Sequence, residues 1–221
     1  MNEKYFKNGL KEHVSEDYDT LGTILALSTL QNGPIPRFLK EEHLQELFFS
    51  ESPSPCIDYL RKGFRRLGLY QIGNAIPNFL HLFRPSQSAA LTRRKLLLLL
   101  HPQFSESGSN ARRYETEIYN VFSNYTREAA SGQRGTVNLE SLLQFITGTN
   151  EEPALGFGVA PSILFVPASD VSEWAFVPQA NTCANTLFLP VRSQEQIPLP
   201  SQEKLFEVYD FAFVNAYFGN N

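Results

Sequence analysis

The spacing of apolar residues changes part-way along the chain, and this change constrains the fold more than any other feature. Up to about residue 148 the apolar residues recur at helical intervals, as at Leu21, Ile24 and Leu25, which is the spacing of an amphipathic helix. Beyond Pro153 the pattern becomes short apolar runs with Ile and Val, as in residues 162–167, which is typical of strands. Helices followed by strands predict an α+β protein with two lobes, residues 1–148 and residues 149–221.

Breakers and caps divide this pattern into predicted elements. Asn32, Gly33 and Pro34 should end the first helix, because Gly tolerates a left-handed cap and Pro cannot continue the helix. Ser201 is a good N-cap for the last helix, with the acidic Glu203 in its first turn. The expected helices cover residues 18–30, 40–49, 56–69, 75–83, 92–100, 111–129 and 139–145 and the segment after Ser201. The expected strands cover residues 162–167, 173–177 and 186–189.

Composition indicates a folded protein with a mildly acidic surface. The chain has 221 residues, is 42% hydrophobic and contains 18 Phe and 9 Tyr, which is enough for a packed core. Its formal net charge of -4 disfavours general binding to nucleic acid or to an anionic membrane, because both attract basic surfaces. The longest aliphatic run, residues 96–100, is too short to cross a bilayer. We therefore expect neither a nucleic-acid nor a membrane partner.

Cysteine and histidine usage indicates a reducing compartment and no metal site. Cys56 and Cys183 are the only cysteines, and residues 1–9 contain no apolar signal-peptide core. A secreted, disulfide-bonded fold is therefore not expected, and a cytoplasmic or nuclear location is. The four histidines are scattered and lack the spacing of zinc ligands. We expect neither a metal nor a cofactor.

Cys183 stands in a polar setting that makes it a candidate nucleophile. Asn181 and Thr182 precede it, Asn185 follows it, and the apolar alternation of Leu187 and Leu189 comes directly after. A cysteine on a turn before a short strand could be a reactive thiol. From the residues alone, a small buried hydrophobic role is the simpler interpretation, because free cysteines usually have that role.

Three parts of the C-terminal sequence resemble HECT-type ubiquitin ligases. Residues 142–157 (LLQFITGTNEEPALGF) are similar to the hinge and the entry of the cysteine-bearing lobe in that family. Residues 178–190 are similar, along the whole motif, to the segment that surrounds the cysteine in that family. The motif positions are occupied in order by Pro178, Ala180, Asn181, Thr182, Cys183, Asn185, Leu187, Leu189 and Pro190. Phe218, fourth from the last residue of the sequence, occupies a position that is aromatic in these ligases.

The resemblance implies a fold, an activity and a set of site residues. It implies a helical partial N-lobe followed by a small α/β C-lobe in which Cys183 carries a ubiquitin thioester and passes it to a substrate lysine. Asn181, Thr182, Asn185 and Phe218 would support that cysteine, and Thr147, Gly148 and Thr149 would form the hinge between the lobes. The implied partners are ubiquitin, a ubiquitin-conjugating enzyme and an unspecified protein substrate.

The N-terminal part resembles one branch of the same family. Residues 25–39 (LALSTLQNGPIPRFL) and residues 59–83 are similar to the branch that contains a plant-homeodomain ligase associated with mitotic entry and its fish relatives. The family's N-lobe begins well before Met1. Only residues 49–57 stand where the family inserts a subdomain that docks the conjugating enzyme, so docking is in doubt.

Two other functions compete with ubiquitin transfer. A degenerate, non-catalytic protein that binds ubiquitin or another partner would keep the same sequence features without turnover. A classical cysteine hydrolase is disfavoured, because no histidine follows Cys183 and the nearest upstream, His101, belongs to the helical part.

Overall fold

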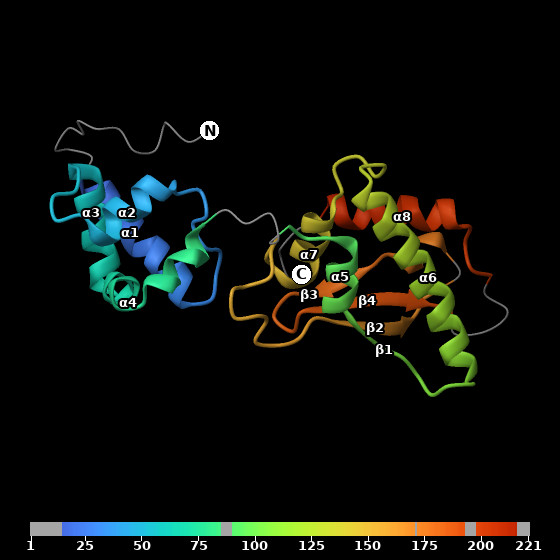
Figure 1. Ribbon diagram of the computed structural model, residues 1–221. Helices are drawn as coiled ribbons and strands as arrows, with labels where there is room; N and C mark the ends of the chain where they lie inside the picture. The colour runs from blue at the N-terminus through green and yellow to red at the C-terminus, as the bar shows by residue number, and fades with distance from the viewer. Residues whose placement is uncertain (1–14, 85–89, 171, 193–197, 216–221) are drawn as a thin grey trace. The chain divides into compact units, whose positions relative to one another are not determined.

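The computed structural model describes residues 15–84, 90–170, 172–192 and 198–215. The chain forms two compact units, shown in Figure 1. The first unit comprises residues 1–90 and 153–156, and the second comprises residues 91–152 and 157–221. Among the described residues, no helix is both long and apolar enough to span a membrane.

The first unit is helical. It contains α1 (Ser15–Leu30), α2 (Glu41–Phe49), α3 (Pro55–Arg66), α4 (Leu69–Ala75) and the 3-10 helix η2 (Pro77–Phe83). The expected break after the first helix is confirmed, with the left-handed residue at Asn32 (φ 59°) rather than at Gly33. The helix expected over 56–69 ends at Arg66, because Gly68 adopts φ 81° and starts α4. The element expected over 75–83 is a 3-10 helix instead of an α-helix.

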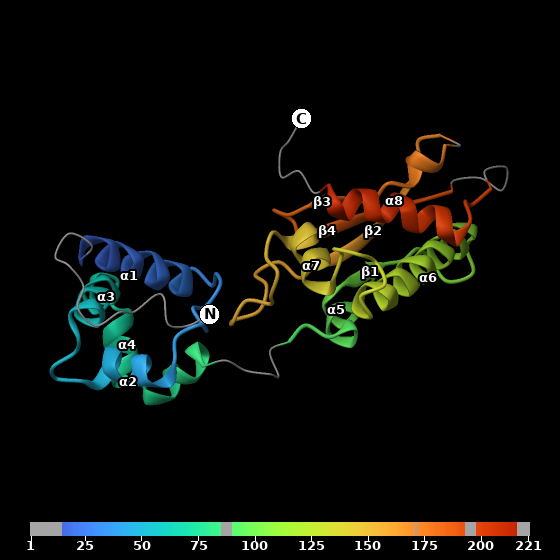
Figure 2. The same ribbon diagram turned by 90° about the horizontal axis from the view of Figure 1, so that it is seen from above.

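Two glycines let α1 and α3 pack backbone to backbone, side by side in Figure 2. A Cβ atom on Gly22 would lie 2.3 Å from the carbonyl oxygen of Leu60, and one on Gly63 would lie 2.3 Å from that of Asp19. The inner face of α1 packs against α3 through these glycines. The remaining faces stay partly open, so α1 is not the mostly buried helix that its apolar residues suggest. Ile24, Leu27 and Leu30 are exposed.

The second unit combines helices with one four-stranded sheet. Its helices are α5 (Arg93–Leu99), α6 (Asn110–Ala130), α7 (Leu139–Thr147), α8 (Gln202–Val214) and the 3-10 helix η4 (Glu173–Phe176). Its strands are β1 (His101–Gln103), β2 (Ser162–Pro167), β3 (Gln179–Asn181) and β4 (Thr186–Val191), in the order β1-β2-β4-β3. Strands β1, β2 and β4 are parallel, and β3 runs antiparallel to β4. This mixed content is compatible with the expected α+β class.

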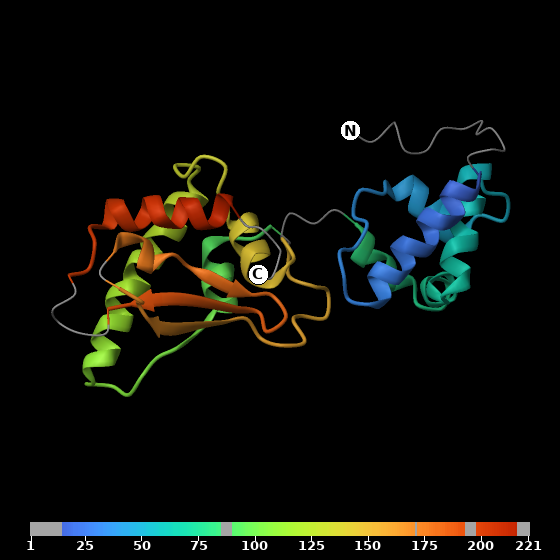
Figure 3. The ribbon, with the colours of Figure 1, turned by 180° about the vertical axis from the view of Figure 1, so that it is seen from behind.

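One face of the sheet is covered by helices and the other is more open. Ile163, Leu187 and Leu189 have no exposed surface and belong to a core shared with α5, α6, α7 and α8. Their neighbours along the strands point to the opposite face, where Leu164 is exposed and Phe188 is half-buried. Figure 3 shows this face, with β2 and β4 in front of α6.

The division between the compact units falls at Leu91, earlier than the boundary expected at residue 148. Helices α5, α6 and α7 share one core with the strands that follow them, and His101 to Gln103 pair with β2. The change in apolar spacing thus separates helix-forming from strand-forming sequence, but it does not separate the units, because these helices are packed onto the sheet.

One further element differs from expectation, and another is less buried than a run of five leucines suggests. Residues 173–176 form a 3-10 helix rather than a strand, because the Ser172 side chain accepts a hydrogen bond from the Trp174 N–H and turns the chain. The run of leucines in α5 is buried on one side only, at Leu96 and Leu100, while Leu98 is 65% exposed.

Polar side chains fix α8 against α6 in the second unit. The Tyr125 hydroxyl donates to Asp210 Oδ1 at 2.6 Å, and Arg134 forms an ion pair with the same carboxylate. Burial and the neighbouring Asp210 carboxylate both raise the pKa of Tyr125 above its usual value. Tyr209 lies next to Asp210 on α8, and its pKa is raised by burial. The expected cap of α8 is confirmed, because Ser201 Oγ accepts from the Lys204 N–H at 3.3 Å.

Candidate functional site

Cys183 lies on the turn that joins β3 to β4. Asn181 pairs with Thr186 across these antiparallel strands, so residues 182–185 form the connection. Cys183 is exposed, whereas Cys56 in α3 is 1% exposed within the first unit's helices. Of the two thiols, Cys183 is the accessible one. The small buried role therefore fits Cys56.

The Asn181 side chain organises the turn around Cys183. Its Oδ1 accepts hydrogen bonds from the N–H of Cys183 at 3.1 Å and of Ala184 at 3.2 Å. The main-chain carbonyl of Asn181 accepts a second bond from Ala184, also at 3.2 Å. A short polar side chain that bonds the backbone ahead of it stabilises a turn. The N–H groups of Cys183 and Ala184 are therefore used within the turn instead of being directed at the sulfur.

Asn185 ties the other end of the turn to the start of β2. It adopts φ 50°, a left-handed conformation that Asn tolerates better than most residues. Its Nδ2 donates to the Val159 carbonyl at 2.7 Å, and its own carbonyl accepts from the Ser162 N–H at 2.9 Å. The side-chain amide of Asn185, which was expected to support the thiol, thus donates its hydrogen bond to Val159. It influences Cys183 by fixing the backbone of the turn.

The expected hinge residues lie beside the turn and in the same compact unit. Gly148 ends α7 with φ 78°, and a Cβ atom placed on it would be 3.8 Å from Thr182 Cβ. Thr147 Oγ1 donates to the Leu143 carbonyl at 2.8 Å and accepts from the Thr149 N–H at 3.3 Å. The structure therefore places Gly148 of the expected hinge beside Thr182 of the Cys183 turn. Phe218 lies outside the described residues.

Within the part of the chain that the structure describes, the Cys183 thiol has no acid-base partner. Among the described residues no hydrogen bond to Cys183 Sγ is found, and no group of three or more His, Cys, Asp or Glu side chains could hold a metal ion. The two other groups expected near the sulfur, Thr182 and Asn185, contribute packing and backbone geometry. The site thus offers an accessible sulfur on a well-defined turn.

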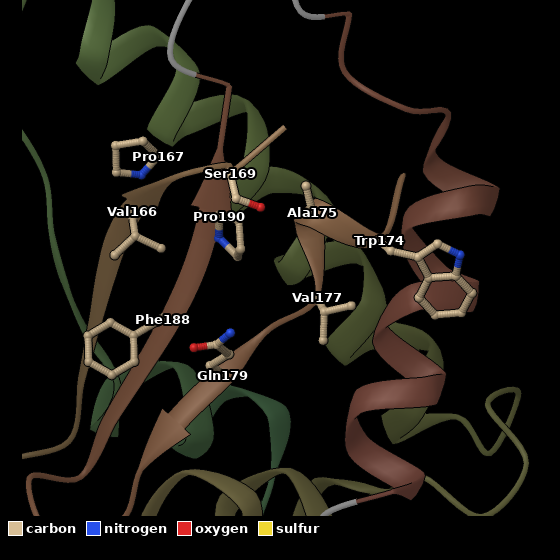
Figure 4. Close-up of a pocket in the computed structure, with 9 residues that line it drawn as sticks. All are labelled: Val166, Pro167, Ser169, Trp174, Ala175, Val177, Gln179, Phe188 and Pro190. Carbon is tan, nitrogen blue, oxygen red and sulfur yellow. The ribbon is translucent and has the colours of Figure 1, made fainter. Parts of the chain in front are cut away.

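A pocket of about 400 Å³ lies on the more open face of the sheet, as Figure 4 shows. Phe188 and Pro190 contribute from β4, Val166 from β2, and Val177 and Trp174 from the segment before β3. Gln179, also in its lining, lies on the same strand as Asn181, so the pocket and the Cys183 turn share an element. Sequence reasoning missed this pocket. The available signal was the chain's single Trp, in a segment interpreted as a strand.

Comparison with known families gives a match in the second unit. Residues 116–205 match the model of the HECT-domain (ubiquitin-transferase) family. The matched segment begins in α6, ends in α8 and contains Cys183 with its complete turn. No curated protein matches the chain. The match supports a HECT-type domain here, and at the family level it implies ubiquitin transfer. It does not reach residues 25–39 or 59–83, on which the resemblance to one branch depends.

Proposed function

We propose that the second unit is the cysteine-bearing lobe of a HECT-type ubiquitin-protein transferase and that Cys183 carries the ubiquitin thioester. The observation that carries this proposal is the exposed Cys183 on the β3–β4 turn, inside the segment that matches the HECT model. The lobe would then begin near Leu91, where the second unit begins.

Two acyl transfers make up the proposed reaction. The Cys183 thiolate attacks the carbonyl carbon of the thioester between ubiquitin and its conjugating enzyme. A new C–S bond forms, the old one breaks, and the conjugating enzyme's cysteine leaves as a thiolate. A lysine amine of the substrate then attacks the Cys183 thioester. An isopeptide C–N bond forms, the C–S bond to Cys183 breaks so that Cys183 leaves as a thiolate, and the amine's proton passes to water.

The protein's contribution in this proposal is the placement of the sulfur. Exchange between thioesters is nearly isoenergetic, so holding the two sulfurs in the correct geometry matters more than a resident base. Well-oriented reactions gain about 7–11 kcal/mol from such placement. Asn181 and Asn185 supply it for Cys183, because they fix both ends of the turn.

The chain has little sequence with which to dock the conjugating enzyme, and this should limit the first transfer. Helix α2 ends at Phe49 and α3 begins at Pro55, so only residues 50–54 stand where the family inserts its docking subdomain. We therefore expect poor loading from free conjugating enzymes, and clear loading when the donor is fused to the chain or present at high concentration. Efficient loading at low donor concentration would mean that another surface docks the enzyme.

Loading without reductant tests the proposal. The chain is incubated with ubiquitin, activating enzyme and a panel of conjugating enzymes, and products are separated with and without thiol. We expect a thiol-sensitive adduct in the native chain and in Cys56→Ala, and none in Cys183→Ala. An adduct that survives in Cys183→Ala, or that never forms even with a fused donor, would contradict the assignment.

A non-catalytic ubiquitin- or partner-binding module is the second candidate. The pocket beside β3 and the exposed Trp174 favour it, because exposed aromatic side chains are common at protein interfaces. Binding of ubiquitin with equal affinity to the native chain and to Cys183→Ala, without any adduct, would support this alternative.

The branch and the location are proposals that depend on sequence alone. Residues 25–39 and 59–83 favour the branch with the mitotic-entry ligase and its fish relatives. A cytoplasmic or nuclear location follows from the cysteine usage. Imaging of the tagged protein in cells would test the location.

A further inference from the structure

The open face of the sheet in the second unit carries an uncharged, mainly apolar pocket, shown in Figure 4. Val166 on β2 and Phe188 on β4 are half-buried there, and Leu164, which pairs with Phe188, is 37% exposed. The nine described residues that line the pocket include no charged side chain. A cavity of about 150 Å³ already admits a benzene ring, so the pocket volume of about 400 Å³ has room for a bulky apolar side chain.

An exposed aromatic pair continues this surface onto α8. Trp174, which lines the pocket, packs edge to face against Phe211, with ring centroids 5.1 Å apart and planes at 78°. Trp174 is 57% exposed and Phe211 is 50% exposed. Figure 4 shows Trp174 on the side of the pocket nearest α8. Exposed aromatic rings beside an apolar pocket are typical anchors of a protein interface.

Acidic side chains flank the aromatic pair. Glu173 directly precedes Trp174, and Glu207 lies one helical turn before Phe211 on the same face of α8. Both carboxylates belong to exposed residues. Lys204, the only basic residue of α8, forms an ion pair with Glu207 at 2.7 Å. That pairing and the more distant Glu173 carboxylate raise the pKa of Lys204, which shows that Glu173 lies near the helix.

The rim of the apolar surface is therefore negatively charged. Glu203 lies one further turn along the face of α8 that carries Glu207, and Asp170 follows Ser169 in the lining of the pocket. Glu203 and Asp170 are both exposed. The single basic residue among them, Lys204, is already paired with Glu207. An apolar surface with a negative rim attracts a partner whose apolar side chains are flanked by lysine or arginine.

A second copy of the chain fits this surface poorly. Two copies related by a two-fold axis would meet through the same patch, and this would bring two negative rims together. Like charges that face one another across an interface oppose association. The charge of the rim therefore favours a basic segment of a different protein.

We propose that this surface docks a short basic amphipathic segment of another protein, with a bulky apolar side chain in the pocket and lysine or arginine beside Glu173 and Glu207. Trp174 and Phe211 then cover the apolar side of the segment. This inference gives a partner class to the partner-binding role of the second unit. It does not depend on ubiquitin transfer, because Cys183 takes no part in the contact.

Three synthetic peptides without tryptophan serve as probes. The first is an amphipathic helix sequence, with Leu and Phe on one helical face and Lys at the other positions. The second replaces every Lys by Glu, and the third replaces every Leu and Phe by Ser. Because the chain contains a single Trp, the emission of Trp174 reports binding when the full chain is titrated with each peptide.

We expect a saturable blue shift of the Trp174 emission with the first peptide only. Added salt should weaken this binding, because ions screen exposed charges. Cys183→Ala should bind the first peptide as the native chain does, so the result is independent of thioester formation. The absence of a shift with the first peptide, or an equal shift with the acidic one, would overturn the proposal.

Two variants of the chain locate the contact. The double variant Glu173→Gln and Glu207→Gln should bind the basic peptide about 2- to 30-fold more weakly, the range for two exposed ion pairs. Phe211→Ser should weaken binding at least about tenfold, as the loss of an aromatic anchor does. Circular dichroism confirms that each variant is folded.

The matched control for the double variant is Glu106→Gln with Glu140→Gln, which changes the net charge equally. Glu106 follows β1, at the opposite edge of the sheet from β3, and Glu140 lies on α7, which packs on the covered face. The control should bind the basic peptide as the native chain does. Equal affinities of the control and the double variant would contradict a contact at Glu173 and Glu207.

The same emission separates two other occupants from the basic segment. Ubiquitin is titrated in parallel with the peptides, and the chain alone is diluted to test for self-association. A shift with ubiquitin and with none of the peptides would overturn the proposal in favour of ubiquitin. A red shift of Trp174 when the chain alone is diluted would overturn it in favour of a second copy.

Discussion

Replacement of Asn185 by alanine should destabilise the second unit and displace Cys183. Asn185 holds φ 50° and donates to the Val159 carbonyl at 2.7 Å. Alanine lacks the short polar side chain that lets Asn tolerate the left-handed conformation, which costs most residues with a Cβ about 1–2 kcal/mol. The lost hydrogen bond adds about 0.5–1.5 kcal/mol. Val159 is exposed, so water replaces part of that bond. We expect a total loss of about 1.5–3 kcal/mol for Asn185→Ala.

Asn185→Gly separates the two contributions. Glycine adopts φ 50° without strain but loses the bond to Val159, and its flexible unfolded state costs about 0.4–1 kcal/mol. Its free energy of unfolding should therefore lie between those of the native chain and Asn185→Ala. Asn120→Ala, on the exposed side of α6, serves as the matched control and should not destabilise the unit, because alanine's higher helix propensity adds at most about 0.7 kcal/mol of stability.

Guanidinium unfolding followed by Trp174 fluorescence is the assay, because Trp174 lies in the same unit as Asn185. The same variants are then tested for ubiquitin loading from a fused donor, where Asn185→Ala should lose more than Asn185→Gly. Unfolding free energies for Asn185→Ala within 0.5 kcal/mol of the native chain (about the lower limit for one hydrogen bond) would refute the reasoning. A less stable Asn185→Gly than Asn185→Ala would refute the argument from backbone conformation.

Three other changes test separate parts of the structure. Alkylation at neutral pH with peptide mapping should label Cys183 before Cys56, because only Cys183 is exposed; faster labelling of Cys56 would contradict this. Gly63→Ala should destabilise the first unit by about 1–3 kcal/mol through overpacking, despite a gain in helix propensity of about 1 kcal/mol, since its Cβ would lie 2.3 Å from the Asp19 carbonyl oxygen. Calorimetry measures this, with Gly158→Ala, which meets open space, as the control; a stabilised Gly63→Ala would disprove the close crossing. Because the folded-state pKa of Tyr125 is raised, its contribution to stability is present below the ordinary tyrosine pKa of about 10 and is lost as pH rises above it. Urea unfolding should show a weaker alkaline loss in Tyr125→Phe, and an unchanged loss would show that Tyr125 does not titrate with unfolding.

Local sequence chemistry determined the ends of most elements. Asn32 ended α1, Ser201 capped α8, and the alternation from Thr186 onward formed β4, because each depends on residues within one or two turns of the chain. The turn around Cys183 was readable for the same reason, because Asn181 and Asn185 act on the backbone nearest to them, but the exposure of the thiol was not.

Only the tertiary structure decided which segments share a core. Strand β1 is three residues long and contains Pro102, so it has no pattern of its own, and it exists because β2 pairs with it. That pairing and the common core of α5, α6 and α7 place the division between the units at Leu91 instead of at residue 148. The approach of Gly148 to Thr182 and the contact of Trp174 with Phe211 likewise join residues that are far apart in the sequence. Such contacts depend on how whole elements pack, and apolar spacing within one element carries no information about its neighbour.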